Sequence, residues 1–159
     1  MTEPIVRPMT SDDILVIVEW MLTDPLWQRY EMRAGEIQSE FRGALERGDL
    51  LLVADADVPA RGFAWCLLNG MFGTQAYLKR IGVDQACTGQ NIGGLLLARI
   101  EELVIASNQD VLFLLVSDFN VGAQRFYRRH GYQQNGEFPG LAIPGVTELL
   151  FSREFRTLA

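Results

Sequence analysis

The sequence is poor in the residues that build metal sites and disulfide networks. It has 2 cysteines and 1 histidine in 159 residues. Cys66 and Cys87 stand alone and match no CxxC or zinc-ligand spacing, so no metal site is expected. A chain of this length needs no disulfide to hold its core, and a reducing cytoplasm is therefore the expected compartment.

The sequence also lacks long apolar runs and an excess of positive charge. No segment approaches the roughly 18 apolar residues of a membrane span, and the opening MTEPIVRPMT has no basic-then-apolar secretion pattern. There are 14 Lys and Arg against 20 Asp and Glu, a net charge of −6. Such a field repels polyanions, so neither nucleic acid nor a membrane is an expected partner. A local cluster of donors could still hold one small anion.

What the chain has is an ordinary globular composition, 48% hydrophobic and 21% charged, with no linker, repeat or low-complexity segment. The hydrophobic periodicity predicts one α/β domain over residues 1–159, in the order βααβββαβαβ. The predicted helices are residues 11–23, 37–45, 92–104 and 123–130. The predicted strands are residues 5–7, 50–54, 62–68, 72–83, 111–117 and 146–155, with an extra short strand at 131–136.

Three local patterns refine these boundaries. Thr10 followed by Asp13 resembles a capping box at the first helix. Gly48 stands where a left-handed cap would end the second helix. Asn69-Gly70, between two apolar runs, predicts a hairpin turn. The turns together predict an antiparallel meander of three strands.

The segment TGQNIGG, residues 88–94, places three glycines between a predicted strand and a predicted helix. A helix N-terminus binds anions through its unpaired N–H groups and its dipole, and glycine lets a ligand approach the backbone. The chain has no GxxxxGK[ST] and no GxGxxG, which excludes the two common nucleotide motifs. From spacing alone, an anion cradle and a connection used only for helix–sheet packing are equal alternatives.

A second segment, SDFNVGAQRFYRRHGY, predicts a short helix with Asn120 as its N-cap and Gly131 as its C-terminal glycine. Phe126 and Tyr127 fall on its inward face. Alone, this pattern is typical of a core helix with two aromatic anchors. His130 is interpreted as a helix-end residue.

Together the two segments resemble the GNAT superfamily of acetyltransferases. The resemblance lies in Val83-x4-Thr88-Gly89-Gln90-Asn91-Ile92-Gly93-x-Leu95-Leu96 and, about thirty residues later, Asn120-x2-Ala123-x2-Phe126-Tyr127-x3-Gly131-Tyr132. The opening IVRPMTSDD is also similar to the family's first strand and helix start. The resemblance covers nearly the whole chain. It implies an α/β (α+β) fold with a mixed, mostly antiparallel sheet of six to seven strands and about four helices.

The resemblance further implies acetyl-CoA as donor and an amine as acceptor. The glycine loop would hold the pyrophosphate, the strand before it would pair with the pantetheine arm, and Asn120 would contact that arm. Tyr127 would lie near the thioester sulfur. The implied donor-binding residues are Ile81, Gly82, Val83, Thr88, Gly89, Gln90, Asn91, Ile92, Gly93, Gly94, Asn120, Ala123, Phe126, Tyr127 and Arg129.

The loop departs from the family pattern at two positions. Thr88 stands where Gln or Arg is usual, and Asn91 replaces the middle glycine. Thr still offers a hydroxyl, and Asn tolerates a left-handed φ better than most residues. The backbone donors are retained, and the departures are expected either to lower CoA affinity or to alter the path of the loop.

The expected chemistry is attack by a neutral amine on the thioester, with Tyr127, a phenol of ordinary pKa about 10, protonating the leaving thiolate. A backbone N–H near the end of the strand at 72–83 would polarise the carbonyl. The strand positions where some relatives carry a Glu hold Tyr77 and Leu115 here. The base is therefore left among Asp118, Glu148 and ordered water.

The acceptor is a small-molecule or peptide/protein amine that the sequence does not identify. Trp27, Tyr30 and Met32 lie in an irregular segment that either lines the acceptor pocket or belongs to the core. Arg125 and Arg128 are interpreted as a solvated helix face. Dimerisation through the C-terminal strands is compatible with the sequence. The alternative function is a CoA-binding sensor or interaction module that lacks catalysis.

Overall fold

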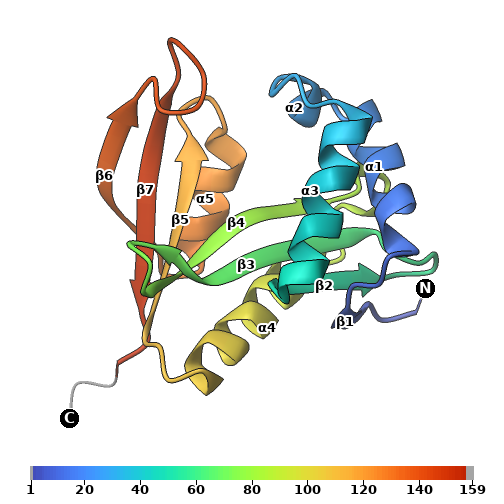
Figure 1. Cartoon of the computed structure of the whole chain (residues 1–159), viewed down its shortest axis with the longest axis horizontal. Coiled ribbons are helices and arrows are strands. Elements are labelled where there is room, and N and C mark those ends of the chain that lie inside the picture. The colour runs from blue at the N-terminus through green and yellow to red at the C-terminus, as the bar shows by residue number, and fades with distance from the viewer. Residues whose placement is uncertain (1, 157–159) are drawn as a thin grey trace. The chain divides into compact units, whose positions relative to one another are not determined.

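The structure is a computed structural model that describes residues 2–156 (Figure 1). Within them lies one seven-stranded sheet of order β1-β2-β3-β4-β5-β7-β6. The β4–β5 pair is parallel, and the β1–β2, β2–β3, β5–β7 and β6–β7 pairs are antiparallel. The elements are β1 (Ile5–Pro8), α1 (Asp13–Thr23), α2 (Pro25–Gln28), α3 (Ala34–Arg47), β2 (Leu50–Asp55), β3 (Gly62–Met71), β4 (Gln75–Val83), a 3-10 turn (Gln85–Cys87), α4 (Ile92–Ala106), β5 (Val111–Ser117), α5 (Val121–Arg129), β6 (Gln133–Pro139) and β7 (Thr147–Glu154).

This architecture confirms the fold class. The described residues form the mixed, mostly antiparallel sheet with four main helices, α1, α3, α4 and α5. The chain divides into two compact units. The first runs to Cys66 and includes Arg80–Ile100, and the second comprises Leu67–Lys79 and the chain from Glu101 onward. The strands β3 and β4 and the helix α4 contribute residues to both units. That the chain acts as a single domain stays a prediction.

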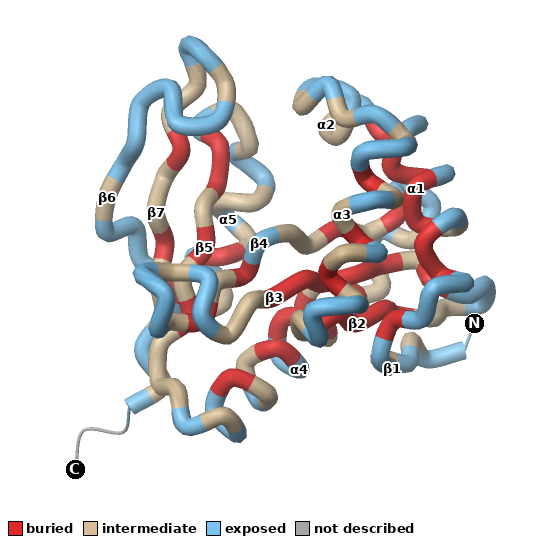
Figure 2. The backbone as a smooth tube through the Cα atoms, viewed as in Figure 1, coloured by how far each residue is buried: buried red, intermediate tan, exposed pale blue. Residues whose placement is uncertain are grey.

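In the first unit, β3 is covered by α3 on one face and by α4 on the other (Figure 1). Phe63 and Trp65 alternate with Gly62 along the strand and therefore point to the opposite face. Their rings lie 5.2 and 5.7 Å from the ring of Phe41 on α3. A Cβ at Gly62 would lie 2.6 Å from Cγ2 of Ile92 on α4, so only glycine lets the helix pack this closely. The residues at both contacts are buried (Figure 2).

The first helix begins two residues later than predicted, at Asp13. The Asp13 carboxylate accepts a hydrogen bond from the Thr10 backbone N–H at 2.7 Å, which is one half of the predicted capping box. The guanidinium of Arg7 donates to both Asp13 oxygens, at 2.8 and 2.9 Å. Hydrogen bonding to Arg7 holds the pKa of Asp13 below its ordinary value. Gly48 ends α3 with φ 75°, as predicted.

In the second unit, β7 lies between β5 and β6, and a register shift between Gln134 and Gly136 bends the outer pair. Burial raises the pKa of the Tyr132 phenol, and so does the neighbouring Glu101 carboxylate. The Tyr132 hydroxyl donates to Glu101 Oε2 at 2.8 Å, and the same oxygen accepts from Arg153 at 3.0 Å. Through Glu101 on α4, these bonds connect Tyr132, which lies between α5 and β6, to Arg153 on β7.

The predicted turn at Asn69-Gly70 is wrong. Both residues lie inside β3, and the chain turns through residues 72–74 instead. Phe72 and Gly73 have φ of 56° and 73°, the consecutive positive values that a tight hairpin needs. Gly70 is required for another reason, since a Cβ there would lie 2.9 Å from Cβ of Tyr77. A second difference is the short helix α2, which occupies part of the segment that showed no period.

Candidate active site

The loop before α4 is anchored by the carboxylate of Asp84, directly after β4. One oxygen accepts from the Ala86 backbone N–H at 3.0 Å and the other from Arg61 Nη1 at 2.8 Å. The backbone N–H of Asp84 donates to the Arg61 carbonyl at 2.8 Å. These bonds fix the chain where it leaves the strand and place residues 88–91 ahead of the helix.

The loop itself is an exposed backbone with two left-handed residues. Gly89 has φ 84° and Asn91 has φ 58°, and both are exposed, as is Thr88. Asn91 therefore adopts a left-handed φ, the conformation that the sequence analysis noted asparagine tolerates better than most residues.

The first turn of α4 presents backbone donors. The Leu95 N–H donates to the Asn91 carbonyl at 3.1 Å, the bond that opens the helix. The N–H groups of Ile92, Gly93 and Gly94 precede it and have no acceptor within the helix. A Cβ at Gly94 would lie 2.3 Å from Oδ1 of Asn91, so glycine is required for the Asn91 amide to lie against this turn. The arrangement suits a small anion.

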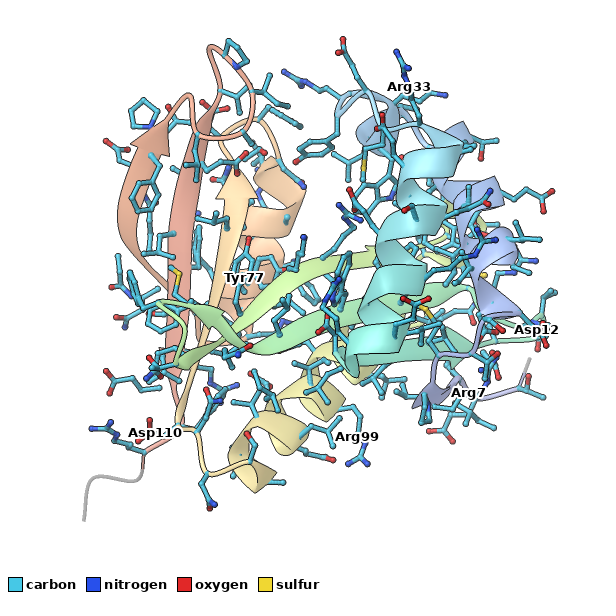
Figure 3. The ribbon with its side chains drawn as sticks, in the orientation of Figure 1. Arg7, Asp12, Arg33, Tyr77, Arg99 and Asp110 are labelled. Atoms are coloured by element: carbon cyan, nitrogen blue, oxygen red, sulfur yellow. The ribbon has the colours of Figure 1, made fainter. Side chains whose placement is uncertain are left out.

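On β4, the residues implied to hold the pantetheine arm are Ile81, Gly82 and Val83. The β4–β5 pairing comprises Ala76–Leu112, Tyr77–Phe113 and Leu78–Leu114, whereas β4 continues to Val83. Tyr77 projects from this strand (Figure 3). This position of β4 therefore carries a phenol and not a carboxylate.

Gly82 lets aromatic rings approach the backbone of β4. A Cβ at this position would lie 2.8 Å from Cε1 of Phe63 and 2.9 Å from Cζ2 of Trp27. The Trp27 ring lies 6.2 Å from that of Tyr30. The irregular aromatic segment therefore packs on the strand that precedes the loop, and its role in an acceptor pocket stays a prediction.

A buried carboxylate links this aromatic segment to the loop. Asp24, 6% exposed, accepts from the Leu26 backbone N–H at 2.9 Å and caps α2. The same Oδ1 accepts from Gln85 Nε2 at 3.1 Å, in the 3-10 turn that leads to the loop. The sequence analysis missed this connection, although Asp24-Pro25 is a typical helix start.

In the second unit, Asn120 is the N-cap of α5, as predicted. Its Oδ1 accepts from the Ala123 N–H at 3.1 Å, and this bond leaves the amide NH₂ available to contact a ligand. Arg129 is exposed at the end of the helix, with Arg125 and Arg128. His130 closes the helix, its Nδ1 lying 2.8 Å from the Phe126 carbonyl oxygen, which agrees with a helix-end role.

Tyr127 is 5% exposed and sits in an aromatic cluster. Its ring centroid lies 5.2 Å from Phe126, 5.7 Å from Tyr132 and 6.5 Å from Phe151. The packing fixes the direction of the phenol. Its role as proton donor stays a prediction.

Both carboxylates considered as a base already have hydrogen-bond partners. Glu148 is 5% exposed and accepts from Ser117 Oγ at 2.8 Å. Asp118 is exposed and accepts from the Thr147 N–H at 3.1 Å, next to the backbone bond from Asp118 N–H to the Thr147 carbonyl. Each serves the junction of β5 and β7.

One further charged pair lies on β4, and the sequence analysis did not single it out. Arg80 Nη1 lies 2.8 Å from Glu40 Oε2 on α3, and the guanidinium carbon lies 5.4 Å from the Trp65 ring centre. A charged side chain on the face of β4 that packs against α3 was the available signal.

The sheet order, with a left-handed, glycine-bearing loop between β4 and the N-terminus of α4, defines an α+β protein. The sequence model of the Acetyltransferase (GNAT) family matches residues 14–132. The chain therefore belongs to the GNAT acetyltransferase family.

Particular relatives agree with this assignment. The Bacillus subtilis (strain 168) protein provisionally named phosphinothricin acetyltransferase YwnH is 34% identical over 85 residues, which cover 50% of this chain and 51% of the relative. The chain thus matches about half the length of that relative.

Solved structures share the fold. A GNAT-family protein from Desulfovibrio desulfuricans superimposes with a TM-score of 0.81 at 17% identity, covering 96% of this chain and 99% of the other. The yncA protein of Salmonella typhimurium, solved with its cofactor acetyl-CoA, gives 0.76 at 15% identity, with 99% and 97% coverage.

Within residues 2–156, no helix is long and apolar enough to cross a membrane. The same residues contain no group of three or more His, Cys, Asp or Glu side chains arranged to hold a metal ion.

Proposed function

We propose that the protein is an N-acetyltransferase that moves an acetyl group from acetyl-CoA to a primary amine, by direct attack in a ternary complex. The observation that carries this proposal is the loop, where left-handed Gly89 and Asn91 lead an exposed backbone into the first turn of α4. The N–H groups of Ile92, Gly93 and Gly94 would donate to the pyrophosphate. We also propose that the protein acts in the cytoplasm.

The backbone of β4 beyond Leu78 supports a place for the pantetheine arm. Residues Ile81–Val83 follow the last β5 pair in the register, so their N–H and C=O groups would bind the arm as a neighbouring strand would. When bound, the donor supplies an activated acetyl group and a thiolate leaving group. A backbone N–H of this stretch would polarise the carbonyl, and Tyr127 would donate the proton that the thiolate takes up.

The acceptor must lose a proton to attack, and we propose that water removes it. Asp118 already accepts a backbone N–H, and Glu148 is buried against a hydroxyl. A solvent relay needs neither carboxylate to leave its partner. Asn120 would then contact the donor through its amide NH₂, and exposed Arg129 would meet the adenosine phosphates.

A second function is favoured by one observation. The strand positions where relatives carry a Glu hold Tyr77 and Leu115, so a CoA-binding sensor without catalysis would keep the loop and lack the base. Binding of CoA without turnover, across a panel of amines and peptides, would select the sensor.

Isothermal titration with acetyl-CoA tests the donor site directly. We expect saturable binding, and at 100 times the dissociation constant a stabilisation of about 2.7 kcal/mol. Absence of binding at millimolar acetyl-CoA would overturn both functions. Turnover is then followed by CoA release with small-molecule and peptide amines. Phosphinothricin is included because of the name of the Bacillus relative.

A further inference from the structure

Arg80 and Glu40 lie close together, but their facing atoms are not fully hydrogen-bonded. Nη1 and Oε2 lie 2.8 Å apart, yet their orientation does not form a hydrogen bond, and neither buried atom has another hydrogen-bond partner within residues 2–156. The side chain of Arg80 is 14% exposed and that of Glu40 is 40% exposed. A guanidinium carries five N–H donors in a planar fork. The Arg80 guanidinium is therefore held in place while most of its N–H donors make no contact with Glu40.

The surroundings fix the guanidinium. It stacks over the Trp65 ring at 5.4 Å, and the Trp65 indole N–H donates to Asp49 Oδ2 at 3.0 Å. Arg47 pairs with the same carboxylate at 3.0 Å. A guanidinium stacked on an anchored ring loses little freedom when a ligand binds it.

The position of Arg80 on β4 places it beside the proposed donor strand. Arg80 and Gly82 alternate with Ile81, so their side chains share one face of the strand. That face is where Trp27 and Phe63 close on Gly82. All of these residues belong to the first unit. The guanidinium therefore flanks the stretch Ile81–Val83, on the side of the aromatic segment.

We propose that Arg80 binds an anionic group of the acceptor, and that the acceptor is an amine that also carries a carboxylate, as an amino acid does. This inference rests on the proposed function and names the substrate class of the same site. Glu40 balances the charge of the guanidinium while the acceptor is absent, and its side chain is 40% exposed, so an ammonium could pair with it. Planar two-point recognition of a carboxylate is the task to which arginine is best suited.

A carboxylate-binding Arg80 would distinguish amino acids from amines that carry no anionic group. Polyamines and simple alkylamines offer no anion and would add a positive charge next to Arg80. A charge-assisted hydrogen bond to a carboxylate contributes roughly 1.5–3 kcal/mol, so its loss should lower kcat/KM about tenfold to a hundredfold.

The test uses matched acceptors that differ in the carboxylate alone. Phenylalanine is compared with phenethylamine, and methionine with its decarboxylated amine, at saturating acetyl-CoA and with CoA release as readout. We expect the amino acid of each pair to be the better substrate by at least tenfold. The variant Arg80→Gln should remove this preference by raising KM for the amino acid, while Arg80→Lys should retain part of it.

Matched controls separate a site effect from a charge or folding effect. Arg42→Gln and Glu46→Gln make the same charge changes at exposed positions of α3 and should leave the preference intact. Removing one partner leaves a half-buried charge alone, so the double variant Glu40→Gln with Arg80→Gln serves as a second test. Acetyl-CoA affinity, measured by titration, should be unchanged in every variant.

The outcomes distinguish this inference from the proposed function. If the wild type does not bind acetyl-CoA, the proposed function fails and this inference with it. If amines are acetylated without preference for the carboxylate, or if Arg80→Gln keeps the preference, the inference alone is wrong. It is equally overturned if acetyl-CoA binds and no amino acid, from the standard twenty at millimolar concentration, is acetylated or shifts the Tm.

Discussion

Two helices in this protein start after an asparagine, and the two asparagines do different things. Asn120 has φ −86° and its side chain accepts from the Ala123 N–H, so it closes the N-terminus of α5. Asn91 has φ 58° and stands in a loop with Gly89, also left-handed, ahead of α4. The first is an ordinary cap. The second holds a left-handed turn immediately before α4, with its side-chain amide against the first turn of that helix.

The difference teaches what a helix N-terminus needs to become a binding site. At α5 the cap satisfies one of the donors that every helix leaves unpaired. At α4, Gly94 leaves room for the Asn91 amide beside the first turn, since a Cβ there would lie 2.3 Å from Asn91 Oδ1. The left-handed Gly89 and Asn91 place an exposed loop directly before that turn. We propose that α4 binds the donor and that α5 supplies the proton, through Tyr127. Each assignment can be broken separately.

The largest effect is expected from Tyr127→Phe. The change keeps the ring that packs against Phe126, Tyr132 and Phe151 and removes only the hydroxyl. Loss of a general acid should lower kcat about 10²- to 10⁴-fold, with acetyl-CoA affinity within a factor of about two. Stopped-flow or steady-state CoA release and titration measure the two quantities.

Tyr132→Phe is the matched control for that prediction. It removes the hydroxyl that donates to Glu101 and should cost about 1 kcal/mol of stability, with kcat unchanged. An unchanged kcat in Tyr127→Phe, on an acceptor that the wild type acetylates, would remove Tyr127 from the chemistry.

The next largest effect is expected from Gly89→Ala. No atom lies within 4 Å of the added Cβ, so the change acts through the left-handed φ of 84° alone. That conformation costs an alanine about 1–2 kcal/mol, and acetyl-CoA should bind about tenfold more weakly with little change in kcat. Titration and saturation kinetics measure this pair of effects.

Gly122→Ala provides the contrast on the other helix. Its Cβ also meets nothing within 4 Å, but the residue lies inside α5, where alanine is favoured by about 0.5–1 kcal/mol. This variant should be slightly more stable and bind acetyl-CoA as the wild type does. If Gly89→Ala and Gly122→Ala weaken acetyl-CoA binding equally, the proposal that the donor binds at α4 and not at α5 is wrong.

The sequence was sufficient where the determining pattern is local. The cap at Asn120, the left-handed Gly48 and the position of the loop before α4 depend on residues within a few positions of each other, and all three are found as predicted. That the loop holds a pyrophosphate stays a prediction. The hairpin was misplaced because tertiary packing overrides turn propensity. Asn69-Gly70 is the stronger local turn signal, yet Gly70 is needed against Tyr77 inside the sheet.

The charged contacts were beyond the sequence for a different reason. The Glu40–Arg80 pair joins a helix to a strand forty residues away, and their approach depends on which face of β4 meets α3. The bond from Gln85 to Asp24 spans a separation of 61 residues. No spacing rule identifies such partners, because nothing in the sequence around Arg80 or Gln85 indicates which distant residue each one contacts.

The smallest effect is expected from the two asparagines themselves, and it tests the comparison most directly. Asn120→Ala removes the cap of α5 and should lower the free energy of unfolding by about 1 kcal/mol.

Asn91→Gly relieves a left-handed residue and restores the family's usual glycine, so stability should stay the same or rise by up to about 1 kcal/mol. Acetyl-CoA should bind about two- to fivefold more tightly to Asn91→Gly, since the amide no longer lies against the donors of α4. Urea unfolding and titration of both variants provide the measurements. Weaker binding by Asn91→Gly would show that the Asn91 side chain is itself a ligand contact rather than an obstacle.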